Sequence, residues 1–180
     1  CYRAVGRDIL PTPGGGSASA AAAAMAAGLA TMVASMSRGK KAYLQFESQL
    51  SAAIARLTPL REELKAAVDA DAESYNSVMK AYKTAKSADE KSGEAMIDAA
   101  LKDATAVPLS VAEKANEIAQ ITDSLGPITN PNMKSDLTTA AALAKAAITG
   151  ALANVEINLS SLKDQPFVDD IRRRTAKISA

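Results

Sequence analysis

The chain of 180 residues carries 21 basic and 20 acidic side chains, contains no histidine, and has one cysteine, Cys1. The missing histidine excludes His-based catalytic triads and Cys/His zinc sites, and the balanced charge excludes the strongly basic surface of a nucleic-acid-binding protein. Catalysis must therefore use carboxylates, Lys, Tyr, Ser, amides or backbone groups without metal or cofactor, and the lone cysteine, which can form no disulfide within the chain, fits a cytoplasmic setting.

The predicted elements are all helical, because no run of β-branched and aromatic residues alternates with a period of two. The length predicts a single domain, residues 1–180, folded as an all-α bundle of five to six helices. A short helical piece at 1–7 comes first. A loop at 9–16 follows, marked by two prolines and three glycines.

The next predicted helix begins at Ser17, a plausible N-cap, and ends near Arg38 and Gly39. Residues 18–37 carry no charge and are long enough to cross a membrane. They are mostly Ala, Ser, Gly and Thr, however, which are much less lipophilic than Leu or Ile. We therefore predict a helix buried at the centre of the bundle and no membrane span.

Two long helices are predicted next, at 40–83 and 91–122, joined by a polar connection at 83–90. Pro59 is expected to kink or break the first of them, and Pro108 lies inside the second.

A second loop at 123–134 precedes a helix at 135–162, which is again rich in Ala and Gly. The sequence Asp164-Gln165-Pro166 then predicts the start of a final helix that ends in the basic cluster Arg172–Arg174. Small side chains let helix backbones approach closely, so we expect the helices at 17–37 and 135–162 to lie centrally.

One carboxylate, that of Asp71, falls on an apolar helical face. Spacings of three and four place it in a stripe with Leu64, Ala67, Val68, Tyr75, Val78 and Tyr82. Asp69 and Glu73 share a different face and are predicted to be solvated. A carboxylate in an apolar environment is typical of a general acid or base. The alternative is that Asp71 reaches water at the edge of the bundle or pairs with a basic residue.

Asn154 and Asn158 are four residues apart and share a face of an otherwise apolar helix. Two amides there need several hydrogen-bond partners. They predict either recognition of a flat, hydrogen-bonding heterocycle or an interhelical amide ladder that fixes the register of the helices.

Two helix starts offer polar groups. Ser135 and Asp136 open one predicted helix, where capping is the ordinary role of such residues. Gly14, Gly15 and Gly16 precede another, where unpaired N–H groups could face a ligand. No GK[ST] follows these glycines and no strand precedes them, so a P-loop or a dinucleotide-binding fold is a poor match.

Six stretches carry a resemblance that extends over nearly the whole chain. They are PTPGGGSASAAAAAMAAGLATMV, GKKAY, VDADAESYNSVM, AVPLSVAE, NPNMKSD and NVEINL. Together they resemble the formimidoyltetrahydrofolate cyclodeaminase family, which also contains single-domain methenyltetrahydrofolate cyclohydrolases. The opening YRAVGRD resembles the start of the cyclodeaminase domain in the bifunctional formiminotransferase enzymes.

The resemblance implies an all-α bundle that forms a homodimer. It implies closure of 5-formimidoyltetrahydrofolate to 5,10-methenyltetrahydrofolate with loss of ammonia. The related cyclohydrolases instead add water to the methenyl compound, and the sequence does not choose between the two reactions.

The resemblance also implies site residues. The catalytic acidic residue of the bifunctional enzymes matches the second Asp of DADAE, which is Asp71 here. The resemblance and the patterns above together predict the substrate-binding residues, namely Gly14, Gly15, Gly16, Ser17, Tyr75, Ser135, Asp136, Asn154 and Asn158.

We expect the substrate to be a reduced folate, with or without a polyglutamate tail. Whether a formiminotransferase domain precedes Cys1 is left open. Two other classes of protein also remain as alternatives: a non-catalytic helical interaction module that serves dimerisation, and a folate-binding scaffold that has lost turnover.

Overall fold

A computed structural model describes residues 12–178, which contain five α-helices and no strand. The helices are α1 (Gly15–Ser37), α2 (Glu47–Ala85), α3 (Glu90–Leu125), α4 (Lys134–Leu159) and α5 (Gln165–Ala176). Short 3₁₀ helices lie between them: η1 (Lys41–Phe46), η2 (Gly126–Ile128) and η3 (Pro131–Met133). The predicted all-α bundle is confirmed, whereas the helical piece predicted at 1–7 lies outside the described residues.

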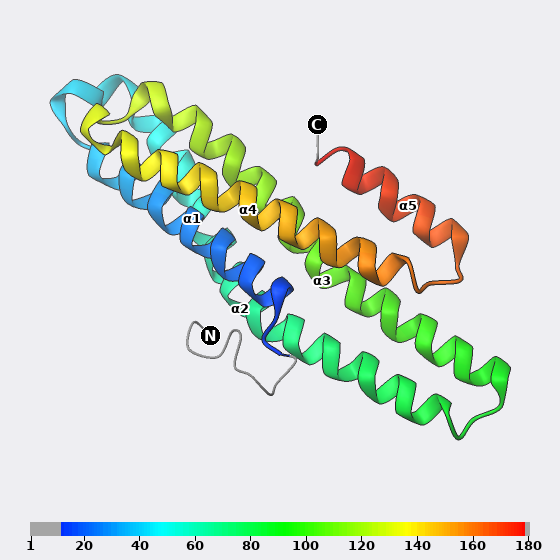
Figure 1. Cartoon of the computed structure of the whole chain (residues 1–180). Coiled ribbons are helices and arrows are strands. Elements are labelled where there is room, and N and C mark those ends of the chain that lie inside the picture. Colours follow the sequence, from blue (N-terminus) through cyan, green and yellow to red (C-terminus); the bar gives the residue numbers. More distant parts are fainter. Residues whose placement is uncertain (1–11, 179–180) are drawn as a thin grey trace.

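The four long helices run alternately up and down as a bundle, and α5 folds back alongside it (Figure 1). α1 packs against α2, α3 and α4, while α3 also packs against α2 and α4. With 39 and 36 residues, α2 and α3 are much longer than α1 and α4. They therefore continue beyond the start of α1 and the end of α4 as a two-helix hairpin (Figure 1).

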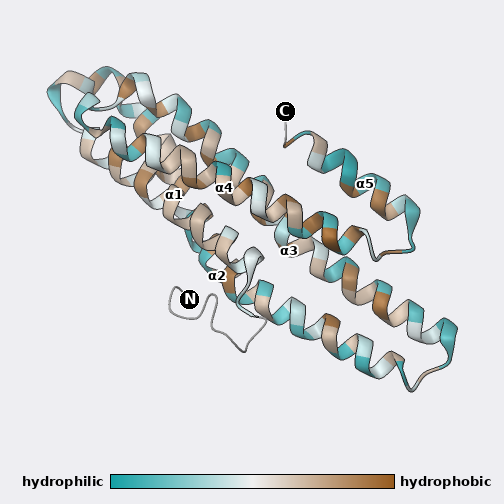
Figure 2. Ribbon diagram, viewed as in Figure 1, coloured by the Kyte–Doolittle hydropathy of each residue, from teal (hydrophilic) through white to brown (hydrophobic). Residues whose placement is uncertain are grey.

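α1 fills the bundle with small side chains. Its buried residues are mostly alanines, and Figure 2 shows apolar colours along most of its length. Both α1 and the segment Pro131–Leu159 are long and apolar enough to cross a membrane by length and composition. Half of the apolar window of α1 is buried against other helices, as expected for the core helix of a bundle.

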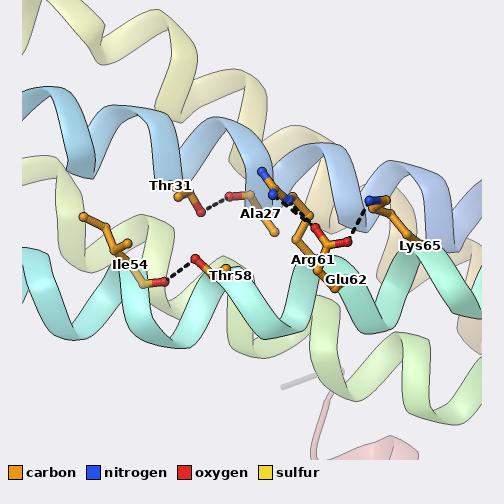
Figure 3. Close-up of polar contacts among 7 residues, drawn as sticks. All are labelled: Ala27, Thr31, Ile54, Thr58, Arg61, Glu62 and Lys65. Atoms are coloured by element: carbon orange, nitrogen blue, oxygen red, sulfur yellow. Dashed lines mark hydrogen bonds and ion pairs between the residues drawn. The ribbon is translucent and has the colours of Figure 1, made fainter.

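Threonines on α1 and α2 bond within their own helix. Thr31 donates to the Ala27 carbonyl at 2.7 Å, and Thr58 donates to the Ile54 carbonyl at 2.8 Å (Figure 3). The nearby charges of Arg61, Glu62 and Lys65 pair with one another on the surface of α2 (Figure 3). Apolar packing therefore dominates this part of the contact between α1 and α2.

Both prolines lie inside unbroken helices, so Pro59 does not break α2, and the kink predicted as the other outcome stays a prediction. A proline inside a helix removes one hydrogen bond and costs about 3 kcal/mol or more. Leu57 and Leu60 flank Pro59 and are fully buried. Their burial offsets that cost, because each fully buried Leu contributes about 1.5–3 kcal/mol.

Three boundaries differ from the prediction. α1 begins at Gly15 with Gly14 as its N-cap residue, so Ser17 is not a cap. The predicted long helix at 40–83 is divided, because residues 41–46 form η1 before α2 begins. α4 begins at Lys134 with Met133 at the N-cap, so Ser135 is not a cap either, although Asp136 lies in the first turn as expected.

The predicted start of the last helix is confirmed. Asp164 caps α5 by accepting a hydrogen bond from the Phe167 N–H at 3.1 Å, and it pairs with Lys102 of α3 at 2.6 Å. The hydrogen bond from Lys102, followed by that from the Phe167 N–H, lowers the pKa of Asp164. Asp164 therefore ties the start of α5 to the bundle.

This contact predicts a pH dependence of stability. A lowered folded-state pKa stabilises the fold fully above the unfolded-state pKa of about 3.9, and the effect is lost as pH falls through the folded-state value. We expect Asp164→Asn to lower the thermal unfolding midpoint at neutral pH. It should have no effect at a pH so low that Asp164 of the wild type is protonated in both the folded and the unfolded state. Melting curves followed by circular dichroism check this, and an equal difference at neutral and strongly acidic pH would contradict it.

Candidate active site

The start of α1, the middle of α3, the second half of α2 and the end of α4 surround a cavity of about 400 Å³. Figure 1 shows that α1 begins, in dark blue, partway along the length of α2. The cavity volume falls within the range of about 300–1,000 Å³ that is typical of small-molecule sites. The principal lining residues are Gly14, Gly15, Gly16, Asp71, Ser74, Tyr75, Leu101, Ala104, Pro108, Asn154, Ile157 and Asn158.

Asp71 is the only charged side chain among the described residues that line this cavity. It is half-buried on α2 and faces the first turn of α1, where its Oδ2 lies 2.8 Å from the Ser17 hydroxyl. No basic side chain within residues 12–178 forms an ion pair with it. Asp69 and Glu73 are exposed, as the spacing predicts. The apolar stripe thus brings one carboxylate to the ligand cavity.

Gly16 lies directly against the Asp71 carboxylate. A Cβ atom on Gly16 would stand 2.6 Å from Asp71 Cγ and closer still to Oδ1, nearer than real Cβ atoms approach other atoms. Gly16 is helical with an ordinary φ, because Gly39 is the only described glycine with a positive φ. The glycine is therefore required by the close approach of α2 and not by its own backbone conformation.

Ser17 does not line the cavity, so the structure does not bring it to the other predicted substrate-binding residues. The side chain is fully buried beneath the first turn of α1. Its Oγ lies 2.9 Å from the Val68 carbonyl oxygen as well as 2.8 Å from Asp71. The hydroxyl therefore touches the carboxylate and not a ligand.

Asn154 and Asn158 both line the cavity, as their shared face predicts. The Asn154 amide donates to the Gly150 carbonyl of its own helix at 2.8 Å, and Asn158 donates to the Ala104 carbonyl of α3 at 3.2 Å. The two amides do not form a ladder with each other. Within residues 12–178 their side-chain oxygens accept no hydrogen bond, which leaves two acceptors for a ligand.

An apolar wall extends the cavity along the hairpin. Tyr75 lines it as predicted, and Val78, Met79 and Tyr82 continue the same face of α2. The sequence did not predict that α3 also lines the cavity. Its lining residues, spaced three and four apart, are indistinguishable from core positions by pattern alone: Leu101, Ala104 and Pro108.

Ser135 and Asp136 do not line this cavity within one chain, and their predicted contact with the substrate stays a prediction. Ser135 lies 19 residues before Asn154 on α4, roughly 28 Å away at a rise of 1.5 Å per residue. A shared helix fixes this separation, so the two ends of α4 cannot meet in a single protomer.

Comparisons with known proteins agree with this geometry. A family model described as formiminotransferase-cyclodeaminase matches residues 7–177. The crystal structure of formiminotetrahydrofolate cyclodeaminase from Thermotoga maritima superposes with a TM-score of 0.87 at 31% identity, covering 96% of this chain and 83% of that one.

Two curated relatives carry related names. A methenyltetrahydrofolate cyclohydrolase from Methylorubrum extorquens is 35% identical over 162 residues, covering 89% of this chain and 78% of that protein. The formimidoyltransferase-cyclodeaminase of Gallus gallus is 36% identical over 168 residues, covering 92% of this chain but only 31% of that longer protein. Sequence and fold agree, and the chain belongs to the formiminotransferase-cyclodeaminase family.

Proposed function

We propose that this domain is a formimidoyltetrahydrofolate cyclodeaminase, which closes 5-formimidoyltetrahydrofolate to 5,10-methenyltetrahydrofolate and releases ammonia. The observation that carries the proposal is a single half-buried carboxylate, Asp71, in a cavity lined otherwise by uncharged residues. The names of the relatives support a folate as the substrate.

The reaction starts from the protonated formimidoyl group and then needs one proton to move between two substrate nitrogens. N10 attacks the formimidoyl carbon on N5 and must lose its proton, while the exocyclic nitrogen must gain one before it leaves as ammonia. A carboxylate close to both can take the proton from N10 and deliver it to the departing nitrogen. Acid–base help of this kind contributes about 10²–10⁴-fold, and we assign it to Asp71.

The other lining groups fit a pterin in the same cavity. The free amide oxygens of Asn154 and Asn158 can accept hydrogen bonds from its ring N–H groups. The bare backbone of Gly14, Gly15 and Gly16 lets a flat ring approach the start of α1. No metal or cofactor takes part in this mechanism.

A second candidate is methenyltetrahydrofolate cyclohydrolase activity in the same cavity. The 35% identity to the Methylorubrum extorquens protein, over 78% of its length, favours it. Water would add to the methenyl carbon and lose one proton to Asp71, and the second proton would pass to N5 as the bond between N5 and this carbon breaks.

Ultraviolet spectroscopy of 5,10-methenyltetrahydrofolate tests both reactions. Enzyme-dependent appearance of the methenyl absorbance from 5-formimidoyltetrahydrofolate is the expected result. Enzyme-dependent decay of the methenyl compound, without its formation, would assign the second candidate instead. If neither rate exceeds the uncatalysed one, both assignments are wrong.

We further propose that the domain acts as a homodimer, with α1 at the interface. α1 has no charged side chain, yet it exposes a stripe of methionines: Met25 at 51%, Met32 at 38% and Met36 at 57%. A second copy apposing the same face would cover these side chains.

The double substitution Met25→Glu/Met32→Glu is expected to convert the dimer to a monomer, because charged side chains resist burial at an apolar interface. Light scattering coupled to size-exclusion chromatography measures the change. Met96→Glu is the matched control, since Met96 is an exposed methionine on α3 and should leave the dimer intact. A wild-type monomer, or a double variant that still dimerises, would contradict the proposal.

The basic clusters give no support for a polyglutamate site. Arg172, Arg173 and Arg174 each pair with a carboxylate, and none of them lines the cavity. Lys40 and Lys41 follow the far end of α1. The proposed cavity therefore binds the ring system of the folate, and no site is proposed for a polyglutamate tail. A formimidoyl-transfer reaction, as named in the longer relatives, would supply the substrate.

A further inference from the structure

One buried polar side chain contacts the Asp71 carboxylate and takes no part in the proposed reaction. Ser17 is fully buried, does not line the cavity, and places its hydroxyl between two oxygens of α2. Oγ lies 2.8 Å from Asp71 Oδ2 and 2.9 Å from the Val68 carbonyl oxygen. Both distances are those of good O–H···O hydrogen bonds.

A hydroxyl has one hydrogen, so Ser17 can donate to only one of these two oxygens at a time. A charged carboxylate is the stronger acceptor, and hydrogen bonds to charged groups are roughly twice as strong as neutral ones. When Asp71 is charged, the Ser17 hydrogen points to Oδ2. Once Asp71 has taken up a proton on Oδ1, Oδ2 is a carbonyl oxygen that can still accept the Ser17 hydrogen, so no heavy atom has to move.

The same contact distinguishes the two oxygens of Asp71. Oδ2 is held by Ser17, whereas no described residue donates a hydrogen bond to Oδ1. Oδ1 packs against Gly16, which lines the cavity. Oδ1 is thus the oxygen left to exchange a proton with a ligand.

We propose that Ser17 is a positioning residue for Asp71: its hydroxyl anchors Oδ2 in both charge states of the carboxyl group and leaves Oδ1 to carry the proton. This inference rests on the proposed cyclodeaminase or cyclohydrolase function. The proton passes from N10 to Oδ1 and from Oδ1 to the departing nitrogen, so Ser17 itself gains and loses none.

Ser17→Ala tests the role, with Ser19→Ala as the matched control. Ser19 is also a buried serine near the start of α1, but its hydroxyl bonds to the Gly15 carbonyl of its own helix at 2.8 Å. Loss of a hydrogen bond to a charged group predicts a decrease in kcat of about 10- to 100-fold for Ser17→Ala, with KM unchanged. Ser17→Cys, with a weaker donor, should fall between wild type and Ser17→Ala. Ser19→Ala should keep the wild-type kcat.

A double variant separates positioning from a general structural effect. In an Asp71→Asn background, Ser17→Ala should cause no further loss of the residual rate, because the group it positions is already inactive. Equal losses in both backgrounds, or an unchanged kcat in Ser17→Ala alone, would overturn the inference.

A crystal structure of Ser17→Ala tests, without any activity measurement, whether Ser17 holds the Asp71 carboxylate in place. The Asp71 carboxylate is expected to leave its place over Gly16, and an unmoved carboxylate would overturn the positioning role. A wild-type protein without turnover on either folate would instead contradict the proposed function, so the two failures are distinguishable.

Discussion

Asp71→Asn is expected to lower kcat by about 10²–10⁴-fold, the contribution typical of general acid–base catalysis, with KM little changed. The amide keeps the shape of the carboxyl group but cannot carry the proton between N10 and the departing nitrogen. It can still bond to Ser17, which both donates and accepts. The fold and the cavity are therefore expected to persist. Initial rates from methenyl absorbance and a binding titration with a reduced folate give kcat and affinity separately.

Asp69→Asn is the matched control for this substitution. Asp69 lies on the same helix but is exposed and outside the cavity. Its replacement should leave both kcat and KM at the wild-type values. Full activity in Asp71→Asn would remove Asp71 from the mechanism. Saturable folate binding without turnover in the wild type would favour a scaffold that has lost catalysis.

Gly16→Ala should lower turnover nearly as much as Asp71→Asn does, although it adds only a methyl group. The new Cβ would stand 2.6 Å from Asp71 Cγ, so the carboxylate must move away from its place between α1 and α2. Small displacements of catalytic groups cost about 10²-fold in rate. We expect a loss of that size in kcat, measured by the same absorbance assay.

Gly28→Ala provides the comparison on the same helix. A Cβ there meets only the Arg61 Cδ atom, at 3.8 Å, which is ordinary contact. Replacing a helical glycine by alanine stabilises by roughly 0.5–1 kcal/mol where the side chain fits. Gly28→Ala should therefore raise the unfolding midpoint and keep full activity. If Gly16→Ala also keeps full kcat, the close approach of Gly16 and Asp71 is not needed for catalysis.

Helical periodicity predicted the part of the site that depends on local spacing. Asp71 and Tyr75 follow the apolar stripe of α2, and Asn154 and Asn158 share one face of α4, so a single helical repeat brings each pair to the cavity. The family resemblance pointed independently to Asp71. The small side chains of α1 likewise predicted its place in the bundle core.

Contacts between distant segments could not be predicted in this way. A serine near a helix start has the local pattern of a cap, yet Ser17 bonds to residues more than 50 positions later in the chain. Ser135 has the same local pattern but lies at the opposite end of α4 from the cavity. Pro59 has the pattern of a helix break, but burial of its neighbours keeps α2 continuous.

In the proposed mechanism, the cavity beside Asp71 holds a reduced folate with its N5–N10 edge at the carboxylate. A crystal structure with 5-formyltetrahydrofolate, in which an oxygen replaces the departing nitrogen, measures this directly. We expect the pterin between Gly14–Gly16 and Asn154, with N10 or the formyl oxygen about 3 Å from Asp71. A folate bound at another surface, or bound here with N5 and N10 turned away from Asp71, would contradict it.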